Sequence, residues 1–329
     1  MFNNSKLLIT GGTGSFGKKF IELSLKKYNF KQIIIYSRDE MKQWDLNQKY
    51  LNNNKIKFVI GDVRDFDRLN ENLKNVDYVV HAAATKIVPT AEYNPFECVK
   101  TNINGAMNVI NASISNKVKK VIALSTDKAS NPINLYGATK LAADKLFIAA
   151  NSNDDEKITK FGVVRYGNVM GSRGSVIPFF HTFKKTEPIP ITDIKMTRFM
   201  ISLEEAVKLV WDAFLDLRGG EIYVKKIPSM KVVDIAQSIN PKAKLKIIGI
   251  RPGEKIHEQM IGYEDAMYTY EYKNYFKILP SLFNWYLDKK RIKNGKKVKE
   301  NFIYSSDNNN KWMTKAQLKE WIKSNLAKK

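Results

Sequence analysis

The stretch KLLITGGTGSFGKKF (residues 6–20) decides the fold of this chain. Its first five residues form a short apolar run that is typical of a buried strand. Gly11, Gly14 and Gly17 follow at intervals of three residues, and a helical pattern begins at once. Glycines at such a turn let backbone N–H groups approach a pyrophosphate, and the positive end of the following helix points at it. The stretch therefore predicts the opening turn of a dinucleotide-binding domain.

The first half of the chain repeats this alternation of strand and helix. Segments with helical spacing, such as 17–27 and 102–115, separate further apolar runs. These runs lie at 32–36, 56–61, 76–83, 120–126 and 161–167. Continuous apolar strands joined by helices are the signature of a parallel sheet covered on both faces, so we expect an α/β fold with a doubly wound parallel sheet.

Prolines become frequent beyond residue 168, and the regular alternation stops. We therefore expect a dinucleotide-binding Rossmann domain over 1–167 and a smaller, mainly substrate-binding domain over 168–329. The segment at about 199–237 is expected to return to the first domain.

Composition excludes several classes of protein. A chain of 329 residues with 43% hydrophobic residues can bury a sizeable core. No apolar run approaches a membrane span, and the N-terminus lacks a signal-peptide pattern, so a cytoplasmic protein is expected. The single Cys98 and three scattered histidines provide neither a disulfide framework nor a metal site.

The net charge of +22 raises the question of a nucleic-acid partner. Lysines are spread along the whole chain, and the densest basic run, KKRIKNGKKVK (289–299), has no interleaved aromatic residue. Such a run is more typical of a solvated surface, so neither a nucleic-acid nor a membrane partner is expected.

The end of the second predicted strand favours NADP over NAD. An NAD site often has an acidic residue there for the ribose 2′-hydroxyl. This chain has Ser37 and Arg38, with Lys42 nearby, and a guanidinium suits a 2′-phosphate. Asp39 would permit NAD if it pointed inward. Further along, Asp62 and Val63 lie where an adenine ring would bind, although Asp62 could equally be a helix cap.

The segment ALSTDKASNPINLYGATK (123–140) carries the chemistry. Tyr136 and Lys140 lie four residues apart, on one face of a helix, where the ammonium can lower the pKa of the phenol. A phenolate so placed is a base for a hydroxyl group. Asp127 and Lys128 add an acid and a second base, which the elimination of water across a C–C bond requires.

These motifs resemble the extended short-chain dehydrogenases/reductases, and in particular the C5-inverting UDP-N-acetylglucosamine 4,6-dehydratases of bacterial pseudaminic acid synthesis. The likeness covers nearly the whole chain and includes HAAATK (81–86), IGIRPGEKIHE (248–258) and YSSDNNNKWM (304–313). Related retaining dehydratases have Asp-Glu where this chain has Asp127-Lys128. The chain departs from the family pattern around the sugar pocket, at Thr85, Ile87, Thr90 and Ser130.

The resemblance implies a role for each residue of the site. Tyr136, assisted by Lys140, would take the C4 hydroxyl proton; Lys128, held neutral, would take the C5 proton; Asp127 would protonate the leaving C6 hydroxyl. Thr126, or Ser125, would steady the substrate oxygen. NADP would be tightly bound and recycled. Further implied cofactor contacts are Thr13, Ser15, Phe16, Ala82, Ala83 and Lys86; implied substrate contacts are Lys86, Asn168, Thr192, Met196, Arg198, Arg251 and Glu254.

Alternatives remain at this stage. A UDP-N-acetylhexosamine 4-epimerase or a C5-retaining 4,6-dehydratase would use much of the same machinery. A binding protein on the same fold without catalysis is the non-enzyme alternative. The resemblance also implies a homo-oligomer, a dimer or a hexamer, with contacts through helices around 95–115 and 136–150.

Overall fold

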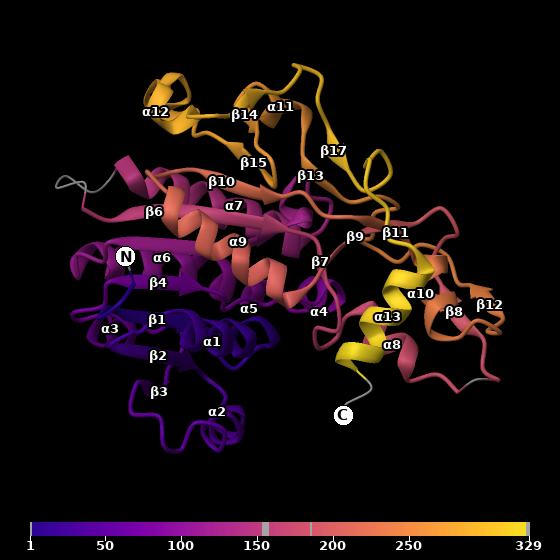
Figure 1. Cartoon of the computed structure of the whole chain (residues 1–329), viewed down its shortest axis with the longest axis horizontal. Helices are drawn as coiled ribbons and strands as arrows, with labels where there is room; N and C mark the ends of the chain where they lie inside the picture. Colours follow the sequence, from indigo (N-terminus) through magenta and orange to yellow (C-terminus); the bar gives the residue numbers. More distant parts are fainter. Residues whose placement is uncertain (1, 153–157, 185, 327–329) are drawn as a thin grey trace.

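A ten-stranded sheet runs through the centre of the molecule (Figure 1). The structure is a computed structural model that describes residues 2–152, 158–184 and 186–326. Across the sheet the strands follow the order β16-β14-β15-β10-β6-β5-β4-β1-β2-β3. The strand order reverses beside β1, between β2 and β4, which is the place where ligands bind in open α/β sheets.

The strands from β3 to β10 in this order are parallel, and the remaining three are antiparallel. The parallel strands are β1 (Lys6–Thr10), β2 (Gln32–Ser37), β3 (Ile56–Ile60), β4 (Tyr78–His81), β5 (Lys120–Thr126), β6 (Lys160–Tyr166) and β10 (Ile222–Lys225). The antiparallel strands are β14 (Thr269–Glu271), β15 (Tyr275–Ile278) and β16 (Lys296–Lys297). The predicted doubly wound sheet is confirmed, and its first six strands lie where the apolar runs placed them.

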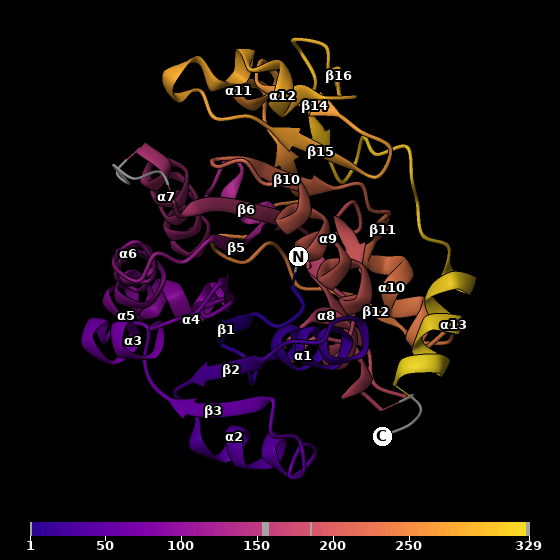
Figure 2. The same ribbon diagram turned by 60° about the vertical axis from the view of Figure 1, so that its left-hand side comes forward.

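Helices cover both faces of the sheet, as Figure 2 shows. On one face lie α1 (Ser15–Lys27) and α9 (Leu203–Asp216), and on the other α3 (Phe66–Asn72), α6 (Gly105–Ser115) and α7 (Leu135–Ala149). The short helices α2 (Glu40–Asn47), α4 (Val88–Tyr93) and α5 (Pro95–Val99) follow strand ends, and a π-helical turn (Lys100–Asn104) precedes α6. The core between these layers is continuous, from Phe2 to Tyr304.

A second, smaller core lies outside the large sheet and includes Ile177, Met230 and Leu318. Three small sheets surround it or join it to the large one: β7 (Asn168–Val169), β9 (Thr197–Ile201) and β11 (Ser229–Lys231); β8 (Ile189–Ile191) and β12 (Leu245–Ile247); and β13 (Gln259–Ile261) and β17 (Tyr304–Ser305). The helices of this region are α8 (Val176–His181), α10 (Val232–Ile239) and α13 (Lys315–Asn325).

Two parts of the second half of the chain lie on the large sheet. Helix α9 and strand β10 fall within the expected return at 199–237. Residues 269–297 also add β14, β15 and β16, an addition that the sequence reading did not foresee. Helix α11 (Tyr263–Ala266) precedes these strands, and a 3-10 turn (Leu282–Leu287) and α12 (Lys289–Ile292) lie between β15 and β16. The division at residue 167 stays a prediction, and residues 153–157, 185 and 327–329 of the predicted domains lie outside the described residues.

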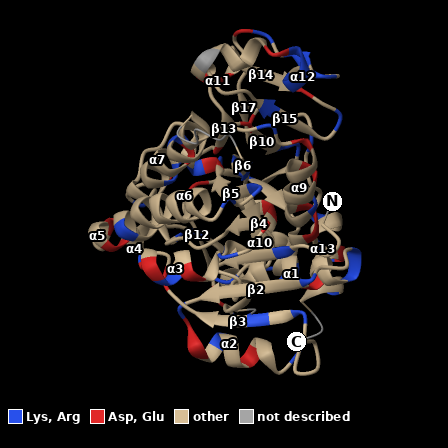
Figure 3. Ribbon diagram, turned by 90° about the vertical axis from the view of Figure 1, so that its left-hand side faces the viewer, with Lys and Arg blue, Asp and Glu red and all other residues tan. Residues whose placement is uncertain are grey.

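In the view of Figure 3 the charged residues are spread over many elements, and blue Lys and Arg segments alternate with red Asp and Glu segments along the ribbon. In the basic run 289–299 the lysines are exposed, whereas Arg291 is buried and pairs with Glu221 at 2.5 Å. Within the described residues, no helix combines the length and the apolar character that crossing a bilayer requires. The same residues contain no cluster of three or more potential metal ligands.

Candidate active site

A cavity of about 2440 Å³ opens at the carboxyl ends of the parallel strands and is closed on its other side by the region around the smaller core. It brings together the predicted cofactor and substrate contacts from both halves of the chain. Lining it are Gly11, Thr13, Gly14, Ser15, Phe16, Gly17, Ser37, Arg38, Lys42, Asp62, Val63, Ala82, Ala83, Lys86, Thr126, Lys128, Tyr136, Lys140, Asn168, Thr192, Met196, Arg198, Arg251 and Glu254. Asp127 does not line the cavity, because it is fully buried behind its neighbours.

The glycine-rich turn forms one wall of the cavity from backbone alone. Gly11 has φ +65°, and a Cβ there would lie 2.9 Å from the backbone of Ala82. A Cβ on Gly17 would lie 2.3 Å from the carbonyl oxygen of Gly12. Helix α1 starts behind this turn without a side-chain cap and without an acidic residue in its first turn. Its free N–H groups therefore suit a pyrophosphate.

Side chains at the ends of β2 and β3 occupy the adenosine end of the cavity. The Thr13 and Ser37 hydroxyls are hydrogen-bonded at 2.7 Å. Arg38 is 57% exposed at its side chain and lies 3.5 Å from Asp62, so its guanidinium is available to an anion. Asp39 instead caps α2: it accepts the Lys42 backbone N–H at 2.9 Å and pairs with the Lys42 ammonium. The Asp39 carboxylate therefore contacts the first turn of α2 and does not point inward to a ribose hydroxyl.

The question of whether Asp62 is a helix cap is also answered by the geometry. Asp65 caps α3 by accepting from the Arg68 N–H at 3.0 Å. Asp62 accepts from the backbone N–H and the guanidinium of Arg64 at 3.0 and 2.9 Å. Its carboxylate thus holds the turn after β3 in place at the edge of the cavity.

Tyr136 and Lys140 project from the first turns of α7. Asn134 starts this helix by accepting the Gly137 N–H at 2.7 Å. The Lys140 ammonium donates to the carbonyl of Leu124 at 2.7 Å, and burial lowers its pKa. Burial raises the pKa of Tyr136 to about 12. The expected pairing is corrected in one respect: the cation that lowers the pKa of the phenol in this structure is Lys128, since Lys140 is held by the strand.

Thr126 and Ser125, the two candidates for the substrate hydroxyl contact, differ in their partners. Ser125 donates to Asp144 at 2.7 Å, behind the strand. The Thr126 hydroxyl donates to Asp127 at 2.9 Å and is hydrogen-bonded to Tyr136. Thr126 therefore connects the buried Asp127 to the residues of the cavity.

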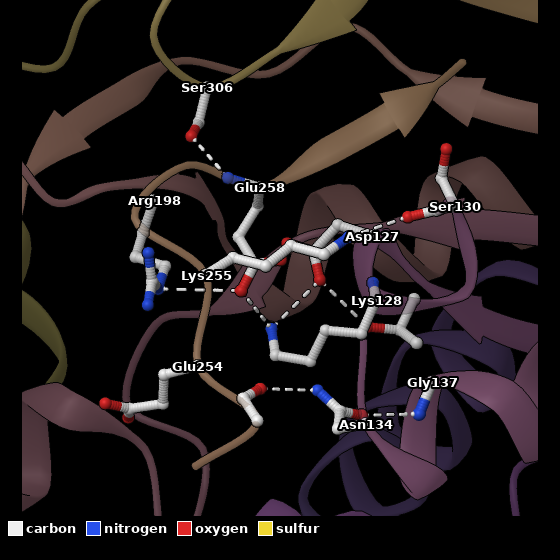
Figure 4. A network of polar contacts seen from close by, with 12 residues as sticks. Asp127, Lys128, Ser130, Asn134, Gly137, Arg198, Glu254, Lys255, Glu258 and Ser306 are labelled. Atoms are coloured by element: carbon white, nitrogen blue, oxygen red, sulfur yellow. Dashed lines mark hydrogen bonds and ion pairs between the residues drawn. The ribbon is translucent and has the colours of Figure 1, made fainter. Parts of the chain in front are cut away.

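Lys128 lies between two carboxylates, as Figure 4 shows. Its Nζ is 3.1 Å from Asp127 Oδ1 and 2.9 Å from Glu258 Oε1. Burial lowers the pKa of Lys128, but the two carboxylates outweigh it and the net shift is upwards. The surroundings of the amine are therefore anionic, where cationic ones were expected, and the role of Lys128 as a neutral base stays a prediction.

Glu258 also lines the cavity, and sequence reasoning did not single it out. It is 2% exposed at its side chain, belongs to the segment between β12 and β13, and also lies 3.7 Å from Arg198 Nε. The Ser306 hydroxyl accepts its backbone N–H at 2.9 Å. The motif RPGEKIHE contains two acidic residues, and nothing in their spacing indicates which of them turns inward.

The remaining substrate candidates line the far end of the cavity. Arg198 donates to the carbonyls of Thr197 and Ile256 at 2.7 and 3.0 Å, which fixes its guanidinium beside the cavity. Arg251 and Glu254 form an ion pair with each other. On the opposite wall, the Lys86 ammonium donates to the carbonyl of Arg173 at 2.8 Å.

The parallel sheet, the glycine turn and the Tyr–Lys pair on α7 define a Rossmann-type protein of the extended short-chain dehydrogenase/reductase class. The DesIV dTDP-glucose 4,6-dehydratase of Streptomyces venezuelae has the same fold: its double mutant superposes with a TM-score of 0.69 at 20% identity, covering 76% of this chain and 86% of that one.

The particular family follows from the sequence comparison. Residues 7–280 match the polysaccharide biosynthesis protein family, and the chain belongs to it. A UDP-N-acetylglucosamine 4,6-dehydratase (inverting) of Campylobacter jejuni is 54% identical over 98% of both chains. A UDP-glucose 4-epimerase of Rickettsia bellii is 46% identical over 84% of both. The structure of Pen from Bacillus thuringiensis superposes with a TM-score of 0.89 at 37% identity, covering 98% of this chain and 99% of that one.

Proposed function

We propose that this protein is an inverting UDP-N-acetylglucosamine 4,6-dehydratase, a hydro-lyase. The observation that carries the proposal is the Asp127–Lys128 pair beside Tyr136, because it supplies an acid and a base in addition to the base at C4. Near-full-length similarity to a relative of that name supports it. The product would be UDP-2-acetamido-2,6-dideoxy-β-L-arabino-hex-4-ulose.

The cavity fits a nicotinamide dinucleotide, because the glycine turn leaves room only for backbone and the N–H groups of α1 face it. We propose NADP, held at its 2′-phosphate by Ser37, Arg38 and Lys42. When bound, the cofactor accepts a hydride from C4 of the sugar and returns it at C6, so there is no net oxidation.

The chain's own residues would move the protons. Tyr136 takes the proton of the C4 hydroxyl, and the resulting 4-keto group acidifies the C5 proton. Lys128 removes that proton, and the C6 hydroxyl leaves as water after protonation by Asp127. Since Asp127 is buried, its proton reaches the cavity through the Thr126 hydroxyl, with which it is hydrogen-bonded. Reprotonation of C5 on the opposite face inverts that carbon.

The other contacts complete the proposed complex. We place the sugar between Lys86 and Asn168, and the UDP group against Thr192, Met196, Arg198, Arg251 and Glu254. An epimerase is the second candidate, since a relative named UDP-glucose 4-epimerase aligns with 84% of the chain at 46% identity. It would not need the Asp127–Lys128 pair, which is why we favour the dehydratase.

We also propose a cytoplasmic homo-oligomer that supplies pseudaminic acid synthesis. The surface of α4 and α5 supports self-association, because Tyr93 and Phe96 are 86% and 79% exposed there and Met107 of α6 is 45% exposed. Light scattering of the purified protein tests this point. Replacing Tyr93 and Phe96 by Ser should reduce the mass to that of a monomer, and an unchanged mass would rule out this surface.

Incubation with UDP-N-acetylglucosamine in deuterated water, followed by NMR of the product, tests the function. The proposal expects a 4-keto-6-deoxy sugar with deuterium at C5 and L-arabino configuration. A C4 epimer without deuterium at C5 would establish the epimerase instead. Deuterium at C5 with retained configuration would contradict the inversion.

The cofactor preference has a separate test. Arg38→Gln removes the guanidinium that faces the 2′-phosphate, so the ratio of NADP to NAD affinity should fall about tenfold or more. Titration of both dinucleotides into the cofactor-free protein measures this ratio. A ratio that Arg38→Gln leaves unchanged would contradict the assignment of Arg38.

A further inference from the structure

Glu258 stands opposite Asp127 across the Lys128 ammonium, and two distant parts of the chain, at Ser306 and Thr197, hold it in place. Ser306 Oγ accepts the Glu258 N–H, and the Ser306 N–H donates to the Glu258 carbonyl at 2.7 Å. The Thr197 hydroxyl lies 2.6 Å from Ser306 Oγ. A side chain with only a surface role would not require this support, and the carboxylate is almost completely buried.

The two carboxylates beside Lys128 have the same arrangement of contacts. In each, one oxygen meets the ammonium, while the second oxygen, Asp127 Oδ2 or Glu258 Oε2, is buried without a hydrogen-bond partner among the described residues. Burying two ionised carboxylates for one lysine is costly. One of the two carboxyl groups is therefore expected to carry a proton.

The positive charges decide which carboxyl group carries it. Arg198 lies on the side of Glu258, at 3.7 Å, and favours its ionised form. Asp127 has only Lys128 and the Thr126 hydroxyl as hydrogen-bond donors in the described structure, and it faces the negative charge of Glu258. Burial raises the pKa of Asp127 and the charge of Glu258 raises it further, whereas Lys128 and Arg198 lower the pKa of Glu258 in spite of its burial.

We propose that Glu258 is a positioning residue for the dehydration, the counter-ion and proton acceptor of Lys128, which leaves Asp127 free to hold the proton for the leaving hydroxyl. This inference rests on the proposed function. It gives the two carboxyl groups different tasks, although they flank the same ammonium at nearly equal distances.

The proton balance closes with these three groups. As Lys128 takes the C5 proton, its ammonium passes one of its own protons over 2.9 Å to the Glu258 carboxylate, so no free amine forms beside the two carboxyl groups. The electron pair of the C5–H bond forms the C5–C6 double bond as the C6–O bond breaks. Asp127 gives its proton, through the Thr126 hydroxyl, to the departing oxygen, so water leaves and Asp127 becomes a carboxylate.

Substitution of Glu258 by Gln removes the charge and the acceptor while keeping the size. We expect the kcat for dehydration to fall about 100-fold, because a general acid–base contribution is lost, with little change in KM. The first oxidation at C4 relies on Tyr136 and should continue, so reduced nicotinamide should accumulate on mixing with UDP-N-acetylglucosamine. A merely structural role would slow both steps together.

The pH profile gives a second readout. Charged groups of several elements influence Asp127 or its partners, and they are Lys128, Tyr136, Arg198, Lys255 and Glu258. Of these, Glu258 raises the pKa of Asp127. Without it, Asp127 should lose its proton at lower pH, so the alkaline fall in kcat should begin at lower pH in Glu258→Gln than in the native protein.

Glu264→Gln is the matched control, because it removes an exposed carboxylate six residues along the chain. Inactivity of the native protein would sink the proposed function itself. Native activity with equal kcat and pH profile in both variants would overturn the role of Glu258 alone. A simultaneous loss of the C4 oxidation would also overturn it.

A measurement on the native protein covers the case in which Glu258→Gln does not fold. With carbon-13 in the Asp carboxyl groups, NMR should show, besides the buried Asp144, a second group that titrates well above the ordinary range and is absent from Asp127→Asn. If Asp127 titrates at or below the ordinary range, Glu258 does not leave it the proton, and the proposal fails.

Discussion

The two sides of the cavity are built in different ways. The cradle between β1 and α1 consists of backbone from one short stretch, with Gly11 and Gly17 leaving no room for side chains. The acid–base cluster opposite consists of side chains from segments far apart, such as Lys128 and Glu258. The cradle requires positions without a side chain, whereas the cluster requires charged groups at defined positions. Substitutions in the cradle should therefore affect stability and cofactor binding, and substitutions in the cluster should affect catalysis.

The largest effect is expected within the cluster, at Tyr136. Tyr136→Phe removes the base for the C4 hydroxyl and should lower kcat by about 10⁴-fold, the upper end for general acid–base catalysis. Dinucleotide binding and the unfolding midpoint should change little, because the ring stays in its buried site. Single-turnover assays and thermal unfolding measure the two properties. Weakened cofactor binding in Tyr136→Phe would show that the acid–base cluster also contributes to cofactor binding.

The second prediction concerns the acid stability of the cradle side. His81 is buried beneath it, with Nδ1 2.9 Å from the Thr10 hydroxyl, and burial lowers its pKa from 6.5 to about 3. The unfolded chain binds this proton near pH 6.5 and the folded chain only near pH 3, so acid favours unfolding. The stabilisation is present above pH 6.5 and falls by up to about 5 kcal/mol towards pH 3.

Urea unfolding between pH 7 and pH 4 can isolate this contribution. As the pH is lowered, the free energy of unfolding should decrease less steeply in His81→Gln than in the native protein, because the buried imidazole is gone. Parallel curves for the two proteins would mean that His81 takes up a proton in the folded state as readily as in the unfolded one.

The third prediction tests the cradle itself. Gly17→Ala places a methyl group 2.3 Å from the Gly12 backbone, which cannot move aside as a flexible side chain could. The overpacking should cost about 3 kcal/mol of stability and weaken dinucleotide binding. Lys26→Ala, on the exposed face of the same helix, is the control for the change in helix composition. Native-like binding in Gly17→Ala would show that the turn has room to spare.

The smallest effect is expected at the support of the cluster. Ser306→Ala leaves the Glu258 N–H without its acceptor and should cost about 1 kcal/mol, with a few-fold loss of kcat. Ser305→Ala is the matched neighbour, whose hydroxyl contacts only Asp307 in the described structure. Thermal unfolding and steady-state assays of the pair measure the difference. Equal values would mean that Glu258 is held in place without Ser306.

The same contrast explains what the sequence could predict. The strands and the glycine turn are local patterns, so Lys6–Thr10 and the start of α1 could be located from spacing alone. The charge of Lys128 could not, because it depends on Glu258, which lies 130 residues away along the chain. The antiparallel strands at 269–297 were also missed, since β14 and β16 are too short to show a pattern.

The return of the chain at Ser306 has a consequence for synthesis on the ribosome. The strands of the cradle are complete once the first third of the chain has emerged, and that part can begin to pack early. Glu258 gains its anchor only when residues 304–306 arrive, near the end of translation. A chain that ends before residue 304 would therefore lack the anchor that holds Glu258 beside Lys128, and the acid–base cluster would be incomplete however early the cradle forms.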